Sequence, residues 1–114
     1  MPTIQLNHLQ CILNDEIDKD EVYLKYKGKK VWPHEIYKSV DNEEKKEIGI
    51  TIEHENIDKP LIIELWDFDY LSLNDHLGDF TMKVDNKPGG PYSTSMVLYE
   101  KNSTASYILT WEIL

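Results

Sequence analysis

Three aspartates lie close together in residues 65–78, directly after a strongly apolar stretch. Asp67, Asp69 and Asp75 have the spacing D-x-D-x5-D, and a Leu-Gly pair follows them. Carboxylates at close range repel one another, so a loop that gathers three of them usually holds a cation. Oxygen ligands suit calcium, which accepts carboxylate and amide oxygens in a flexible geometry. The sequence therefore predicts a calcium site in this loop.

Other metal sites and catalytic sites are poorly supported by the sequence. An EF-hand loop starting at Asp67 would lack the glycine at its sixth position and the glutamate at its twelfth. The four histidines show neither H-x-x-x-H nor H-E-x-x-H spacing, which argues against zinc. No G-x-S-x-G motif and no phosphate-binding glycine loop occurs. We therefore predict that the protein is not an enzyme.

The composition fits one domain over residues 1–114. The chain is 40% hydrophobic, enough for one core, and no apolar run reaches the ~20 residues that span a bilayer. The first residues lack the basic and apolar regions of a secretion signal. Cys11 has no partner cysteine and reads as a small core residue. We expect a cytoplasmic protein, attached peripherally to a membrane if it binds lipid.

The formal net charge of −9 argues against nucleic acid as a partner, because phosphate binding needs a basic surface. The charges are unevenly distributed, and the local field matters more than the sum. A candidate basic patch consists of Lys25, Lys27, Lys29 and Lys30. It could meet lipid phosphates or acids of a protein partner, or it could simply keep an exposed strand soluble.

Period-two alternation and β-branched or aromatic residues dominate the sequence, which predicts an all-β protein. A slip in the pattern near His8 predicts a bulge or a switch of face, and Pro33 interrupts the third strand. Short strands separated by turns predict an eight-stranded antiparallel Greek-key β-sandwich. The expected strands are residues 3–13, 21–28, 30–40, 47–55, 61–66 (the most apolar, hence central), 77–84, 93–100 and 105–113.

The acidic clusters fall in alternate loops of this predicted sandwich. An antiparallel chain usually changes ends at each turn, so the first, third and fifth loops lie at one end. These loops are residues 14–20, 41–46 and 67–76, and they carry the three acidic clusters. Since like charges that converge need a counter-ion, this placement also favours a metal site at one tip.

Two segments resemble the C2 domain, a family of calcium-dependent lipid-binding modules. Trp66-Asp67-Phe68-Asp69, followed by Asn74-Asp75-His76-Leu77-Gly78, resembles its third calcium loop. Asp20-Glu21-Val22-Tyr23-Leu24-Lys25 resembles the segment that ends its first calcium loop. The last residues, 107–113, resemble the strand that opens the other circular permutant, which suggests the second (type II) C2 topology.

The resemblance implies four calcium ligands: Asp20, Asp67, Asp69 and Asp75. The partner of Asp20 in the first loop normally lies six residues earlier, at Asn14, and Asp15 is one residue away; either side chain could serve. Glu21 stands where the family has proline, which is a departure from the pattern.

Apolar side chains accompany these acids: Ile17 in the first loop and Tyr70, Leu71 and Leu73 in the fifth. They could enter a headgroup layer once calcium neutralises the acids, each buried methylene contributing ~0.8 kcal/mol, or they could fold back onto the rim of the sandwich. We expect a calcium-binding C2-like module that docks to anionic phospholipid membranes through its acidic tip. The alternative is a protein–protein or structural module of a larger assembly, in which calcium is structural or absent.

Overall fold

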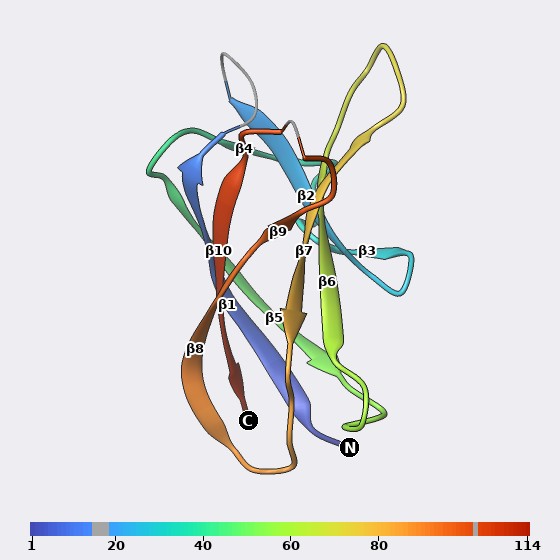
Figure 1. Ribbon diagram of the computed structural model, residues 1–114, viewed down its shortest axis with the longest axis vertical. Helices are drawn as coiled ribbons and strands as arrows, with labels where there is room; N and C mark the ends of the chain where they lie inside the picture. The colour runs from blue at the N-terminus through green and yellow to red at the C-terminus, as the bar shows by residue number, and fades with distance from the viewer. Residues whose placement is uncertain (15–18, 102) are drawn as a thin grey trace.

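The computed structural model describes residues 1–14, 19–101 and 103–114, and Figure 1 shows two antiparallel sheets. Among these residues no helix is long and apolar enough to cross a bilayer. The strands are β1 (Thr3–Leu13), β2 (Asp20–Tyr26), β3 (Lys29–Trp32), β4 (Lys38–Val40), β5 (Lys45–Glu53), β6 (Leu61–Asp67), β7 (Asp75–Met82), β8 (Gly89–Ser95), β9 (Val97–Leu98) and β10 (Ser106–Ile113).

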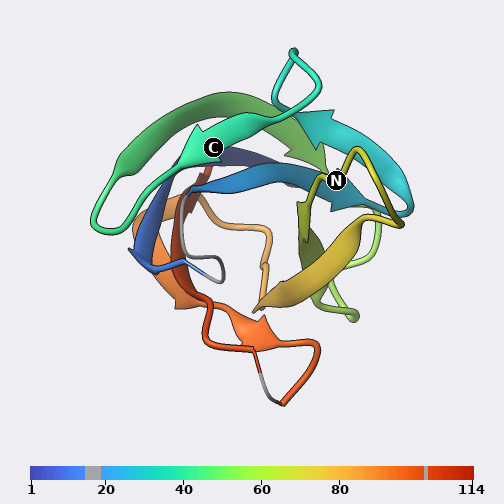
Figure 2. The same cartoon turned by 90° about the horizontal axis from the view of Figure 1, so that it is seen from above.

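The two sheets face each other across a shared core (Figure 2). One sheet has the strand order β5-β1-β10-β8, and the other has β3-β2-β6-β7-β9 with β4 also paired to β2. The non-consecutive order shows that the chain crosses repeatedly between sheets, as in a Greek key. The apolar strand β6 lies in the middle of its sheet, which confirms the prediction made for residues 61–66.

Alternation along the strands builds the core. In β6 the side chains of Leu61, Ile63 and Leu65 are fully buried, while their neighbours point outward. In β1 the buried positions change from even to odd numbers, and both paired strands show a register shift between Leu6 and His8. A bulge has this effect because one extra residue moves the later side chains to the other face. The predicted irregularity near His8 is therefore confirmed.

The structure has ten described strands, not the eight predicted, and one reason lies at Pro33. The predicted strand 30–40 is divided into β3 and β4, which pair with different halves of β2. Proline has no backbone N–H to donate to the ladder, so the chain leaves the sheet after Trp32 and rejoins it at Lys38.

The second division separates β8 from β9, within the predicted strand 93–100. β8 pairs with β10 in one sheet, whereas β9 pairs with β7 in the other. Between them, the N–H of Met96 donates to the carbonyl of Tyr107 (2.9 Å). One alternating segment thus serves two sheets, which alternation alone does not reveal.

Gly78 in β7 has no room for a side chain beside the segment that leads into β9. A Cβ atom there would lie 2.5 Å from the carbonyl oxygen of Val97 and 2.6 Å from Cγ of Met96. We expect Gly78→Ala to lower the free energy of unfolding by about 1–3 kcal/mol, because the backbone oxygen must move. Urea denaturation measures this loss. Thr81→Ala, at an exposed position of the same strand, should change it by less than about 0.5 kcal/mol; equal losses would refute the steric explanation.

Candidate functional site

The described parts of the acidic loops lie at one end of the sandwich, opposite the two chain termini (Figure 1), although the third and fifth loops lie on opposite sides of that end (Figure 2). The N–H of Asn14 donates to Oδ1 of Asn42 (2.7 Å), which joins the first and third loops. The N–H of Phe68 donates to the carbonyl of Glu21 (2.7 Å), which joins the fifth loop to the start of β2. The described parts of the three loops therefore share one end, as predicted, and the meeting of their carboxylates at a single point stays a prediction. Asp15 and Ile17 lie outside the described residues.

Two of the predicted ligands, Asp20 and Asp67, are buried where β2 and β6 approach this end. Asp20 is 0% exposed and Asp67 3% exposed. Oδ2 of Asp20 accepts a hydrogen bond from the hydroxyl of Tyr107 (2.5 Å) on the facing sheet. Oδ1 of Asp67 accepts one from the N–H of Glu21 (2.9 Å). These bonds fix both carboxylates at the base of the loops.

The Tyr107 hydroxyl keeps its proton and donates a hydrogen bond to Asp20. Burial first, and then the bond to Asp20, raise the pKa of Tyr107 far above its ordinary value. Tyr107→Phe removes this bond and should lower the free energy of unfolding by about 1.5–3 kcal/mol, as expected for a hydrogen bond to a charged group. Thermal or urea unfolding at neutral pH measures the loss. Tyr92→Phe alters a tyrosine that is 44% exposed and is the matched control; an equal loss in both variants would contradict the role of the Tyr107–Asp20 hydrogen bond.

Cys11 lies near Tyr107 on the paired strand and is fully buried, as predicted for a small core residue. Burial is the largest influence on its thiol and raises the pKa of Cys11 to about 11. A thiol with so high a pKa carries almost no thiolate at neutral pH, so Cys11 is not suited to act as a nucleophile.

Asp69 and Asp75 are the exposed predicted ligands, and both flank the fifth loop. Oδ1 of Asp69 accepts from the N–H of Leu71 (2.9 Å), and Oδ2 accepts from the hydroxyl of Ser72 (2.7 Å). These bonds hold the pKa of Asp69 below its usual value, so the carboxylate is charged at neutral pH. Asp75 lies directly opposite Asp67 in the β6–β7 ladder.

The predicted ligands share one end of the molecule but not one closed cage. The side chain of Asn14 lies 3.5 Å from Oδ1 of Asp41, so it faces the third loop. No three of Asp20, Asp67, Asp69 and Asp75 bring ligand atoms within 4.8 Å of one another, as judged over the described part of the chain. Carboxylates and an amide are nevertheless the donor set that calcium prefers. Their role as calcium ligands stays a prediction.

The fifth loop carries large apolar side chains in contact with solvent. Leu71 is 97% exposed, Leu73 89% and Tyr70 70%. Asn74 anchors the loop, since its Oδ1 accepts from the N–H of Asp69 (2.9 Å) and its Nδ2 donates to the hydroxyl of Tyr23 (2.8 Å). The two leucines are thus held away from the sandwich rim, on the same loop as the exposed aspartates.

The four lysines of the candidate basic patch have different surroundings. The Lys25 ammonium lies 4.3 Å from the centre of the Trp66 ring, and Nζ of Lys27 lies 4.0 Å from Oε2 of Glu55. Lys30 donates to the backbone carbonyls of Glu35 and Ile36. Lys29, at the start of β3, is exposed. Their role in binding a partner stays a prediction.

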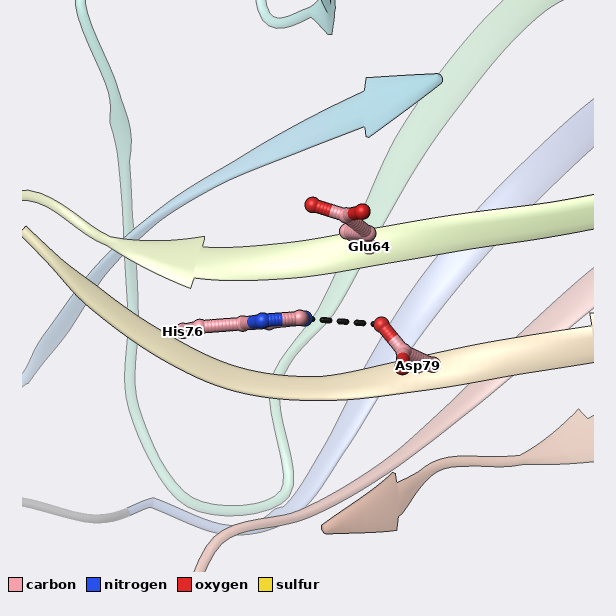
Figure 3. Close-up of side chains that lie close together, drawn as sticks. All are labelled: Glu64, His76 and Asp79. Atoms are coloured by element: carbon pink, nitrogen blue, oxygen red, sulfur yellow. Dashed lines mark hydrogen bonds and ion pairs between the residues drawn. The ribbon is translucent and has the colours of Figure 1, made fainter. Parts of the chain in front are cut away.

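A further group of possible metal ligands, which the sequence reasoning missed, lies on the outer face of β6 and β7. Glu64, His76 and Asp79 place their ligand atoms within 4.8 Å of one another (Figure 3). It is the one such group of three or more ligands among the described residues. His-x-x-Asp places these residues on opposite faces of a regular strand, so spacing alone gives no signal.

The surface of the described residues is hollowed in several places, and two of the hollows bear on the candidate site. One of about 360 Å³ lies beside the fifth loop and is lined by Leu73, Asp75, His76 and Tyr99 among others. The other, of about 450 Å³, lies away from the acidic loops and is lined by Tyr26, His54 and Ile62 among others. The larger cavity contains none of the predicted ligands.

Comparison with known proteins supports the fold alone. No protein-family model matches the sequence, and no curated protein matches it. Among solved structures, the chain is similar to a C2 domain (domain A) of a plant extended synaptotagmin 1, at 11% sequence identity and a TM-score of 0.56. The match covers 99% of this chain and 91% of that one. The protein therefore has a C2-like β-sandwich fold, and its type II topology stays a prediction.

Proposed function

We propose that this protein is a calcium-binding module that docks to anionic phospholipid membranes through its acidic end. One observation carries the proposal: the same loop presents two exposed carboxylates, Asp69 and Asp75, and two leucines in full contact with solvent. Solvated acidic loops seldom expose neighbouring leucines, whereas a membrane-inserting loop needs them. The C2-like fold is typical of non-catalytic binding modules, and we expect the protein to act at the cytoplasmic face of a membrane.

The carboxylates of the tip would control docking through charge. Asp20, Asp67, Asp69 and Asp75 would hold the cation, with Asn14 or Asp15 contributing from the first loop. In the absence of calcium these side chains repel an anionic surface. Bound calcium would supply the positive charge that reverses this repulsion and attracts lipid phosphates. With two ions held, the net charge changes from −9 to −5.

The leucines would supply the hydrophobic part of the attachment. Leu71 and Leu73 are almost fully exposed, so nearly all of their surface would leave water on insertion. Each leucine contributes about 1.5–3 kcal/mol when fully buried. Tyr70 would lie at the headgroup level, where an aromatic ring with a polar tip is favoured. The charge of bound calcium would thus select an anionic membrane, and the leucines would strengthen the attachment to it.

Sedimentation with vesicles tests the proposal. The protein should pellet with phosphatidylcholine–phosphatidylserine vesicles in calcium, and remain in the supernatant with chelator or with pure phosphatidylcholine vesicles. Pelleting that is independent of calcium would point to the lysines. If the protein pellets under none of these conditions, membrane docking is wrong.

A protein–protein module is the second candidate, and the internal bonding of the loops favours it. The carboxylates of Asp20 and Asp69 already accept hydrogen bonds from Tyr107, Leu71 and Ser72. These bonds can hold the loops without a metal ion. In this case the protein would bind no vesicles, and calcium would be structural or absent.

A further inference from the structure

We propose that Glu64, His76 and Asp79 form a second metal site, which takes a divalent transition-metal ion such as Zn²⁺. The site lies on the outer face of the sheet, and its residues are not among the calcium ligands expected at the loop end. The proposal is independent of calcium-dependent docking. It rests on the geometry of two neighbouring strands, shown in Figure 3.

A bulge in β7 brings the three side chains to one face. Glu64 lies directly opposite Asp79 in the β6–β7 ladder, and Trp66 lies opposite His76. Between these pairs β7 has one more residue than β6, and the register shifts there. In a regular strand His76 and Asp79, three residues apart, would point to opposite faces. The extra residue puts both on the outer face beside Glu64.

The imidazole is held in place by two aromatic rings. The ring centre of His76 lies 4.7 Å from that of Trp66, with an angle of 5° between the planes. The centre of the Tyr99 ring, just after the end of β9, lies 4.2 Å from the centre of the His76 ring, at 24°. The side chain of His76 is only 13% exposed. Such packing fixes the orientation of a ligand before the metal arrives.

Both carboxylates are also oriented. Nε1 of Trp66 donates to Oε1 of Glu64 (2.8 Å), which directs that carboxylate along the sheet face. Oδ1 of Asp79 lies 2.7 Å from Nε2 of His76. The Glu64 bond resembles the outer-shell support that metal-binding carboxylates usually have.

The ligand types select the class of metal. One imidazole nitrogen and two carboxylate oxygens suit Zn²⁺ and its neighbours Co²⁺ and Ni²⁺, with water completing the coordination. Calcium prefers six or more oxygen ligands, which this group does not offer. Tetrahedral zinc places its ligand atoms about 3.3 Å apart, so zinc would replace the 2.7 Å hydrogen bond between Nε2 of His76 and Oδ1 of Asp79 and release its proton to solvent.

Calorimetric titration of Zn²⁺ into chelator-stripped protein tests the site. The unmodified protein should bind one ion saturably, and Asp79→Asn should weaken the affinity at least tenfold. His76→Phe keeps a ring between Trp66 and Tyr99 but removes the nitrogen ligand. It should also weaken the zinc affinity at least tenfold. Glu64→Gln keeps an acceptor oxygen for the bond from Trp66 but loses the charged ligand, and it should also weaken the zinc affinity. Circular dichroism shows whether each variant is folded.

Two controls separate this site from others. His34→Phe alters an exposed histidine elsewhere and should leave zinc affinity unchanged. Asp67→Asn combined with Asp69→Asn alters the loop end and should also leave it unchanged. The proposal is overturned if the unmodified protein shows no saturable zinc binding, or if folded His76→Phe and Asp79→Asn proteins keep full affinity. Calcium titrations of the same variants report separately on the loop end.

Discussion

Replacing Asp67 and Asp69 together by asparagine is expected to abolish calcium binding and leave the fold intact. Asparagine has the same shape as aspartate and keeps one acceptor oxygen for the N–H of Glu21 and of Leu71. It lacks the negative charge that attracts the cation. We expect the calcium affinity to fall by at least about 100-fold, or about 2.8 kcal/mol, in a calorimetric titration.

The matched control for this variant lies at the other end of β6 and β7. Asp58→Asn combined with Asp85→Asn removes the same charge from loops away from the acidic end. This control should bind calcium as the unmodified protein does. If calcium affinity survives in Asp67→Asn/Asp69→Asn, the assignment of the ligands is wrong. A loss of equal size in both variants would indicate that only the overall charge matters.

Replacing Leu71 and Leu73 by serine is expected to remove most of the membrane attachment without changing the calcium affinity in solution. The two side chains are 97% and 89% exposed, so the folded protein loses no core packing. Each contributes about 1.5–3 kcal/mol on burial in lipid, and partitioning should fall at least about 100-fold in vesicle sedimentation. Calorimetry without lipid measures calcium affinity separately.

A matched pair of apolar residues away from the acidic end provides the control. Ile57 and Ile62 are 38% and 42% exposed. Ile57→Ser combined with Ile62→Ser should leave calcium-dependent sedimentation unchanged. If vesicle binding of Leu71→Ser/Leu73→Ser is undiminished, the loop does not enter the membrane, and attachment through charge alone would have to explain the result.

The sequence predicts the architecture well because alternation and turns are local signals. β6 and β10 show uninterrupted alternation of buried and outward positions, and both lie where the pattern predicts strands. The counting of loops also predicts which acidic segments share an end. By contrast, the predicted strand 93–100 contains the end of β8 and all of β9, and the chain changes sheet at Met96, whose N–H donates to the carbonyl of Tyr107. A contact over that separation has no local signature.

The candidate sites show the same division between local and long-range information. The spacing of Asp67, Asp69 and Asp75 is visible in the sequence, but the burial of Asp20 is not, since it depends on Tyr107 across the sandwich. The Glu64–His76–Asp79 group requires both the β6–β7 register and a bulge. Period-two reasoning separates His76 from Asp79 and therefore misses the group.

Calorimetric titration of Ca²⁺ into chelator-stripped protein, with Mg²⁺ as the control, tests the central claim most directly. Docking, the charge reversal and the role of the fifth loop all depend on calcium being held by the acidic end. We predict saturable binding of calcium and much weaker binding of magnesium, which demands a stricter geometry and dehydrates reluctantly. A flat trace at millimolar calcium would contradict the account and leave a C2-like scaffold whose partner is a protein.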